Sequence, residues 1–308
     1  MRKNNLAGPV PSREPVLCGV LLVDKPRGPT SHDMVNLVRR LAGVRKVGHA
    51  GSLDPFATGL LVMLIGRGAR LFDLLSPLEK EYRVEVRFGF NSTTGDVDGQ
   101  ITPAAGAPVT RESLLEVLPR FTGLISQRPH RYSAVKMGGE ALYRKARRGE
   151  AVEAPSRQVE VRRLELVDFK EEIQQADLLV ACSKGTYIRS LCEDIAAALG
   201  PGAYAAGLRR TAVGEYRVED AASPEKLRQM ACGSLLGPDN PSFISCLGAL
   251  YFLPVREVDE IEARAVATGQ PLAGGGAQPV RIDYQGRLLA VYGPAGAGGV
   301  MRPLVVLA

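Results

Sequence analysis

Gly48-His49-Ala50-Gly51-Ser52-Leu53-Asp54-Pro55-Phe56-Ala57-Thr58-Gly59 is the stretch around which the rest of the chain is organised. Its glycines predict a tightly turning backbone that comes close to another part of the molecule. The continuous apolar run at 60–65 predicts a buried strand directly after it. Pro55 fixes its own φ and disfavours helical geometry at Asp54. The pattern indicates a carboxylate rigidly presented by a loop, although an isolated Asp-Pro more often only caps a turn.

This dodecamer resembles the active-site motif of the TruB family of tRNA pseudouridine synthases, which reads Gly-His-x-Gly-x-Leu-Asp-Pro-x-Ala-x-Gly. Every fixed position of that motif is matched. A second stretch, Ser-Lys-Gly-Thr-Tyr-Ile-Arg at 183–189, and the segment 207–214 are also similar to the family. The resemblance implies isomerisation of uridine to pseudouridine at position 55 in the T-arm of tRNA, with base flipping and an essential aspartate nucleophile.

The resemblance also implies roles for individual side chains. Asp54 would act either by adding to the uracil ring or by assisting cleavage at C1′, and Arg189 would keep it ionised in a dry pocket. Tyr82 would stack on the uracil and help to move a proton. From pattern alone, Tyr82 is a core residue of its strand, while a surface ion pair is the less favoured alternative for Arg189. The other expected substrate-binding residues are His49, Tyr187, Leu208, Lys25, Lys136 and Tyr132.

Composition narrows the class of protein only moderately. The 308 residues are 45% hydrophobic and carry a formal charge of +6, which favours a polyanionic partner but is equally compatible with ordinary solubility. Five scattered cysteines and three histidines predict no zinc site and no disulfide framework, as in a reducing compartment. We see no signal-peptide pattern, no apolar run of membrane-spanning length and no nucleotide-binding motif. We therefore expect a cytoplasmic protein without a cofactor, which the isomerisation does not require.

Local patterns predict most of the regular elements. Thr30 and Asp33 are placed as a capping box for a helix that ends at Gly43. A second capped helix is expected at 110–118, and a third follows Ser190. The loop 91–100 superficially resembles a calcium loop, but it lacks the terminal glutamate and is better interpreted as a polar turn. Strands are expected at 19–24, 60–65, 80–89, 158–169 and 177–182.

Two segments carry clustered cations that suit RNA. Residues 39–46 contain four of them immediately before the dodecamer, where they would contact phosphates, although a solvated surface explains them as simply. Residues 127–155 mix basic side chains with tyrosines, a combination typical of binding to looped or single-stranded RNA. This second segment resembles the mobile thumb insertion of the family, with Tyr132–Lys136 as its recognisable part. His130 stands where the family usually has a proline.

The resemblance implies an α+β pseudouridine-synthase fold, with a large central mixed or antiparallel sheet flanked by helices and a thumb insertion. We expect a disordered tail at 1–16, a catalytic domain at 17–250 and a small, β-rich, PUA-like RNA-binding domain at 251–308. The protein is expected to be a monomer that binds the T-arm stem-loop of tRNA, without a metal, a membrane or an obligate protein partner. Two alternatives stay open: a non-catalytic tRNA-binding or folding module, and a relative that depends on a guide RNA.

Overall fold

The computed structural model describes residues 18–308, apart from 131, 133–135, 143, 144, 146, 147, 149, 151–153, 231–233 and 295–297. Within that range the side chains at 18, 136, 137 and 141 are not described. The predicted disordered tail at 1–16 and much of the predicted thumb therefore lie outside the described residues. In the part of the thumb that is described, two short strands pair with each other, β8 (Lys136–Met137) and β9 (Glu140–Ala141).

Ten strands form one large sheet, in which the order β14-β1-β3-β12-β4-β11-β10-β7 is extended by β13 beside β12 and β2 beside β3. Every described pairing in it is antiparallel, apart from the parallel contact of β3 with β12. The predicted mixed sheet is thus confirmed. Its strands are β1 (Cys18–Lys25), β2 (Val47–His49), β3 (Thr58–Gly66), β4 (Lys80–Phe88), β7 (Gly123–Gln127), β10 (Arg157–Lys170), β11 (Gln175–Cys182), β12 (Ala203–Val213), β13 (Tyr216–Arg217) and β14 (Phe243–Ser245).

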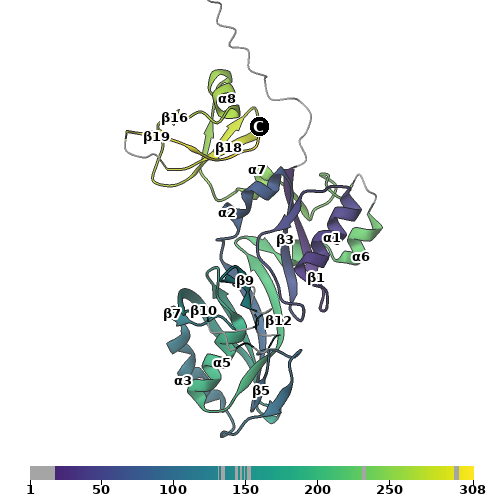
Figure 1. The fold of residues 1–308 in the computed structure, drawn as a ribbon, viewed down its shortest axis with the longest axis vertical. Coiled ribbons are helices and arrows are strands. Elements are labelled where there is room, and N and C mark those ends of the chain that lie inside the picture. Colours follow the sequence, from purple (N-terminus) through teal and green to yellow (C-terminus); the bar gives the residue numbers. More distant parts are fainter. Residues whose placement is uncertain are drawn as a thin grey trace, which may run out of the picture.

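Two groups of helices cover different parts of this sheet (Figure 1). The helices α1 (Ser31–Ala42) and α6 (Pro224–Gln229) pack on β1 and β3, while α3 (Arg111–Val117) and α5 (Ile188–Leu199) pack on β4, β11 and β12. The predicted capping box of α1 is present, and the helix ends at Gly43 with φ +65°. This geometry is free of Cβ strain only in glycine, which explains why the helix stops there.

Strand β4 shows why an alternating segment has one wet face. Val84, Val86 and Phe88 are buried against α5 and the neighbouring strands, while the residues between them point outward. Tyr82 shares the inner side and packs against the same cluster, but it is only half-buried. After β4, the strands β5 (Phe90–Ser92) and β6 (Ile101–Pro103) pair across the polar turn that was predicted at 91–100.

A small, β-rich unit forms the C-terminal end of the chain. Its main sheet has the order β15-β17-β18-β20, and a short pair β16-β19 and the helix α8 complete it (Figure 1). The bounds are β15 (Val255–Glu257), α8 (Glu260–Ala267), β16 (Leu272–Ala273), β17 (Val280–Tyr284), β18 (Arg287–Tyr292), β19 (Val300–Met301) and β20 (Pro303–Val306). A small β-rich C-terminal unit was expected from the order of elements.

The C-terminal unit packs against the first unit through η1 (Arg67–Leu71), α2 (Phe72–Leu75) and α7 (Cys246–Ala249). Arg67 Nη1 donates to the Leu307 carbonyl at 2.6 Å, and Arg70 Nη1 donates to the Val306 carbonyl at 2.5 Å. Leu307 is buried in the same apolar cluster as Leu71 and Leu75. The two units therefore share a hydrophobic core instead of being joined only by a linker.

The cysteines correct one expectation. Cys246 is disulfide-bonded, whereas Cys182 and Cys192 are buried free thiols, so the expectation of no disulfide framework is wrong at Cys246. Cys246 follows β14, which pairs with β1 from the other end of the chain. Spacing along the sequence gives no sign of the disulfide at Cys246. Among the described residues, no helix is long and apolar enough to cross a membrane.

Candidate active site

The dodecamer forms a loop between β2 and β3, and two segments hold it in place. Ser31, the first residue of α1, accepts a hydrogen bond from the Leu53 N–H at 2.8 Å and donates to the Leu53 carbonyl at 3.1 Å. The turn after β1 holds the Pro55 carbonyl, which accepts from the Gly28 N–H at 2.9 Å and from Lys25 Nζ at 3.2 Å. These bonds fix the backbone on both sides of Asp54, as a rigidly presented carboxylate requires.

The Asp54 carboxylate stands in a cleft of about 560 Å³, which we call the active cleft. The cleft collects residues from parts of the sequence that are far apart. Its walls are formed by the loop residues Ala50–Asp54, by Phe72, Ser76, Lys80 and Tyr82, by Arg157–Val159, by Ser183–Arg189, and by Leu208 and Arg210.

Arg189 ties this carboxylate to a second one. From the first turn of α5, its Nη2 lies 2.8 Å from Asp54 Oδ2, and its Nη1 lies 2.9 Å from Asp96 Oδ2. The same guanidinium donates to the carbonyls of Thr94 at 2.8 Å and Tyr132 at 3.1 Å. Its side chain is only 5% exposed, and both terminal nitrogens have partners, so this is a buried ion pair rather than a surface one.

The surroundings of Asp54 have opposing effects on the pKa of its carboxyl. Burial raises the pKa of the Asp54 carboxyl above its ordinary value, and the positive charge of Arg189 opposes that rise. The negative charge of Asp96 adds to it. The ionised form of Asp54 therefore depends on Arg189, as the pairing predicted from the sequence requires.

Asp96 is the missed residue that lies nearest to the reacting pair, through Arg189. Its side chain is 7% exposed, and it also accepts hydrogen bonds from Thr94 Oγ1 at 2.6 Å and from the Asp98 N–H at 3.1 Å. We interpreted this loop as a polar turn, which its backbone confirms. Nothing local distinguishes Asp96 from the exposed Asp98 beside it, because only α5, far along the chain, brings the arginine to one of them.

The predicted aromatic and apolar residues line the active cleft. Tyr82 and Leu208 lie on the neighbouring strands β4 and β12, and Tyr187 precedes α5. The main chain of Tyr187 is held by Gln127, whose side-chain amide accepts from the Tyr187 N–H at 2.7 Å and donates to its carbonyl at 3.0 Å. The Arg157 guanidinium lies 4.7 Å from the centre of the Tyr187 ring. Arg157, Phe72 and Lys80 were not predicted from the sequence to belong to this site.

Lys25 lies beside the loop, His49 lies at its start where β2 ends, and neither is on the wall of the cleft. Lys25 is fully buried, and its Nζ donates to the carbonyls of Pro26, Pro29 and Pro55, while burial lowers its pKa to about 8. This position favours a role in holding the loop over the predicted contact with substrate. His49 is half-buried, and burial and the nearby Arg210 charge lower its pKa, so the imidazole is neutral at pH 7.

The two thumb residues are described to different extents. Tyr132 places its carbonyl on Arg189, and its ring stacks on His130 with the centroids 5.9 Å apart. His130 in turn lies 3.4 Å from Glu193 of α5. The imidazole that replaces the expected proline thus connects the thumb to the helix that carries Arg189. The side chain of Lys136 lies outside the described residues, so its predicted contact with substrate stays a prediction.

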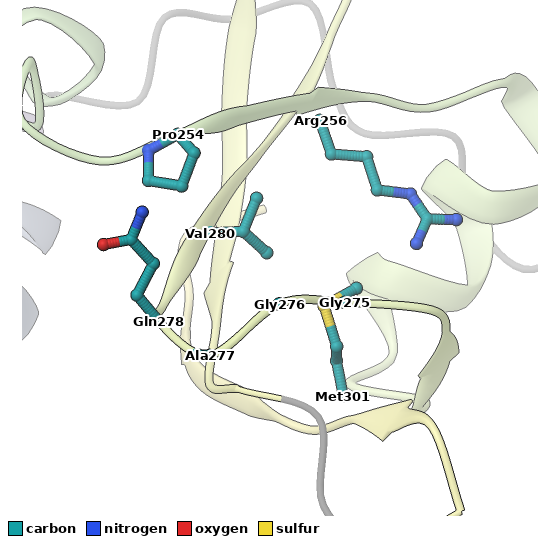
Figure 2. Close-up of a pocket in the computed structure, with 8 residues that line it drawn as sticks. All are labelled: Pro254, Arg256, Gly275, Gly276, Ala277, Gln278, Val280 and Met301. Carbon is teal, nitrogen blue, oxygen red and sulfur yellow. The ribbon is translucent and has the colours of Figure 1, made fainter.

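A further pocket of about 610 Å³ lies in the C-terminal unit (Figure 2). Its one charged side chain, Arg256, is already bonded to the Ala273 carbonyl at 2.6 Å and to Glu262 at 2.5 Å. The rest of the lining is Pro254, Val280, Met301, the neutral amide of Gln278 and the small residues at 275–277, so it offers no second reactive site. In the described part of the chain, no three His, Cys, Asp or Glu residues gather as metal ligands.

Comparison with known proteins identifies close relatives of this chain. A family model described as "TruB family pseudouridylate synthase (N terminal domain)" matches residues 39–188, and a model described as "tRNA pseudouridylate synthase B C-terminal domain" matches residues 189–234. A tRNA pseudouridine synthase B from Thermobifida fusca is 40% identical, covering 94% of this chain and 98% of the relative. Another from Azoarcus sp. is 41% identical, covering 90% and 91%.

Among solved structures, a chain in the "Structure of H/ACA RNP bound to a substrate RNA containing 2'-deoxyuridine" has a TM-score of 0.71 at 22% identity. That match covers all of this chain and 94% of the other. A chain in the archaeal box H/ACA sRNP Nop10-Cbf5 complex has a TM-score of 0.68 at 24% identity, covering 95% and 85%. These likenesses establish a common fold, and the predicted fold class is confirmed.

Proposed function

Because the chain belongs to the TruB family and is a tRNA pseudouridine synthase that isomerises uridine to pseudouridine, we propose that its target is the uridine at position 55 in the T-arm, with Asp54 as nucleophile. The observation that carries the proposal is the 2.8 Å ion pair between Asp54 and Arg189 inside the active cleft. A carboxylate must be ionised to attack, and a forked guanidinium keeps it so without becoming uncharged itself.

The net reaction takes no atoms from a cofactor or a second substrate. The C1′–N1 bond breaks, the detached uracil turns, and C5 bonds to C1′; C5 loses its proton and N1 takes one up, so the product is an isomer of the substrate. Asp54 supplies the carboxylate, either at the uracil ring or at C1′. Tyr82 lies beside it to stack on the uracil and to move a proton, and Tyr187 and Leu208 close the walls so that the detached base does not escape.

The target base must leave its stack before Asp54 can reach it, which costs a few kcal/mol. Aromatic side chains in the cleft offset part of that cost by stacking on the flipped base. His49, neutral and adjacent to the loop, would fill the space that the base leaves in the RNA. The cations at 39–46 and in the thumb would bind phosphates, and the C-terminal β-rich unit would act as a PUA-like RNA-binding domain.

Asp54→Asn tests the nucleophile directly. The amide keeps the size of the side chain but cannot attack, so we expect turnover to fall by roughly 10⁴-fold or more. Affinity for a T-arm stem-loop should change by no more than about threefold, since the amide still fits the cleft. Tritium release from C5-labelled uridine measures turnover, and filter binding measures affinity. Release by Asp54→Asn at the wild-type rate would refute the assignment.

Asp168→Asn is the matched control, because Asp168 is an exposed aspartate near the far end of β10 and should leave both quantities unchanged. The same assay separates the proposed function from both alternatives. A non-catalytic module would bind the stem-loop and release no tritium even as wild type. A guide-dependent enzyme would be inactive on the naked stem-loop, whereas we propose that this protein acts on it alone and as a monomer.

A further inference from the structure

Arg210 is a buried cation on the wall of the active cleft for which the reaction outlined above has no use. Arg210 is 2% exposed, and none of the described carboxylates forms an ion pair with its guanidinium. Burying a guanidinium without a counter-charge is costly unless its donors are satisfied. We therefore expect the role of Arg210 to lie in the groups to which its N–H donors are hydrogen-bonded.

All three nitrogens of the Arg210 guanidinium donate to backbone carbonyls at the two ends of the Asp54 loop. Nη2 donates to Gly51 at 3.0 Å and Nη1 to Ser52 at 3.3 Å, both shortly before Asp54 in the sequence. Nε donates to Leu60 at 2.7 Å, at the point where the loop enters β3. One side chain therefore connects the start of the loop to its end.

The main chain of Arg210 touches the same loop. Arg210 is paired with Gly59 in the parallel contact of β12 with β3. The approach is so close that a Cβ atom on Gly59 would lie 2.3 Å from the Arg210 carbonyl oxygen, well inside contact distance. The glycine that closes the dodecamer is thus needed because the Arg210 backbone lies against it.

The guanidinium also adjoins Tyr82. Arg210 and Tyr82 are directly opposite in the antiparallel pairing of β12 with β4, and both line the active cleft. Burial raises the pKa of the Tyr82 hydroxyl, while the charge of Arg210 and a side-chain hydrogen bond to it oppose the rise. Arg210 is therefore in contact with the loop that carries Asp54 and with the ring proposed to stack on the base.

We propose that Arg210 is a positioning residue that holds Asp54 and Tyr82 in a fixed relation across the active cleft. The inference rests on the proposed roles of those two residues. A lysine could not replace it, because an ammonium group has no planar fork with which to reach carbonyls on both ends of the loop. Displacing a reacting group by about 1 Å costs on the order of 100-fold in rate, so the loss should fall on the chemical step.

Arg210→Lys is the test, with the whole protein and a T-arm stem-loop. We expect the single-turnover rate of pseudouridine formation to fall by about 100-fold, while the dissociation constant for the RNA changes by no more than about threefold. Arg209→Lys is the matched control: Arg209 is the preceding residue, 41% exposed, and bonded to Asp24 at 2.8 and 3.0 Å instead of to the loop. It should keep the wild-type rate. A wild-type rate in Arg210→Lys overturns the proposal.

A second measurement distinguishes positioning from a general loss of structure. If Arg210 acts through Tyr82, the rate losses of Arg210→Lys and Tyr82→Phe should not multiply in the double variant. Losses that multiply would remove Tyr82 from the proposal. Rates are compared at a temperature well below the thermal unfolding midpoint of each variant. If Arg210→Lys does not fold, Arg210→Gln replaces it, since glutamine is uncharged but keeps an amide donor.

The outcome also separates this inference from the proposed function. A wild-type protein that forms no pseudouridine in the stem-loop, or an Asp54→Asn variant that remains active, defeats the proposed function. An inactive Asp54→Asn variant combined with a fully active Arg210→Lys variant defeats only the role of Arg210.

Discussion

At the scale of single residues, the active cleft depends on how one carboxylate is charged. Asp54 is pushed toward its neutral form by burial and by Asp96, and toward its ionised form by Arg189. Arg189 is shared between the two carboxylates, each within 3 Å of a different nitrogen. The proposed attack by Asp54 requires its ionised form, so we expect this balance to set the pH range of activity.

The raised pKa of Asp54 predicts that activity is lost on the acid side at a higher pH than an ordinary aspartate would give. Arg189 lowers this pKa, so Arg189→Gln should raise it and move the acid limb of the rate profile upward by about one pH unit or more. Single-turnover rates measured from about pH 4.5 to about pH 8.5 give the pH of the half-maximal rate in each protein.

Arg163→Gln is the control for this profile, because Arg163 is exposed on β10 and paired with Glu165. Its acid limb should coincide with that of the wild type. An acid limb that stays in place in Arg189→Gln, or moves to lower pH, would mean that a group other than Asp54 titrates in the reaction.

At the scale of elements, the site is built where β12 lies between β3 and β4. The parallel contact with β3 brings Arg210 beside Gly59, and the antiparallel contact with β4 brings it opposite Tyr82. A shift of register by one residue would turn these side chains to the other face of the sheet. The close approach at Gly59 therefore helps to set the register of β12 against β3 in the active cleft.

Gly59→Ala should destabilise the fold strongly. Gly59 has φ +100°, and an added Cβ would meet backbone atoms of Arg210 that have no room to move. We expect the free energy of unfolding to fall by about 3 kcal/mol, the sum of backbone strain and steric overlap. Urea denaturation with linear extrapolation measures it.

Gly89→Ala is the matched control, since Gly89 has a similar φ of +81° but nothing within 4 Å of the added Cβ. It should lose only about 1 kcal/mol from backbone strain. Equal losses in the two variants would show that strain alone, and not the approach of β12, makes Gly59 necessary.

At the scale of the whole molecule, the C-terminal unit supports the cleft from outside. Arg67 and Arg70 of η1 donate to the last residues of the chain, and Leu307 is buried with Leu71 and Leu75. Phe72 and Ser76, on the same helical segment, line the active cleft. The unit that lies farthest along the sequence thus packs on the element that forms one wall of the site.

Leu307→Ala should weaken this packing and lower the free energy of unfolding by about 2 to 4 kcal/mol, as large-to-small changes in a core do. Leu307 is 6% exposed, whereas Leu304 on β20 is 55% exposed. Leu304→Ala should therefore change stability by no more than about 0.5 kcal/mol. Urea denaturation compares the two variants. If Leu307→Ala has as little effect as Leu304→Ala, the two units do not stabilise each other through this cluster.

The sequence by itself determined the features that depend on neighbours along the chain. The capping box at Thr30, the alternation along β4 and the loop around Asp54 follow from backbone preferences and side-chain periodicity within a few residues, and all were predicted. The motifs also predicted that Asp54 and Arg189 would meet, because the family resemblance supplied a pairing that spacing could not.

Only the tertiary structure decided which other charges surround that pair. Asp96 reaches Arg189 because α5 lies beside the β5–β6 turn, Arg210 reaches the loop through the register of β12, and Lys25 is buried with its ammonium group on the Pro55 carbonyl. Each of these contacts joins residues whose local sequences carry no sign of the other. They exist because the order of strands in the sheet and the burial that it imposes bring distant parts of the chain within hydrogen-bonding distance.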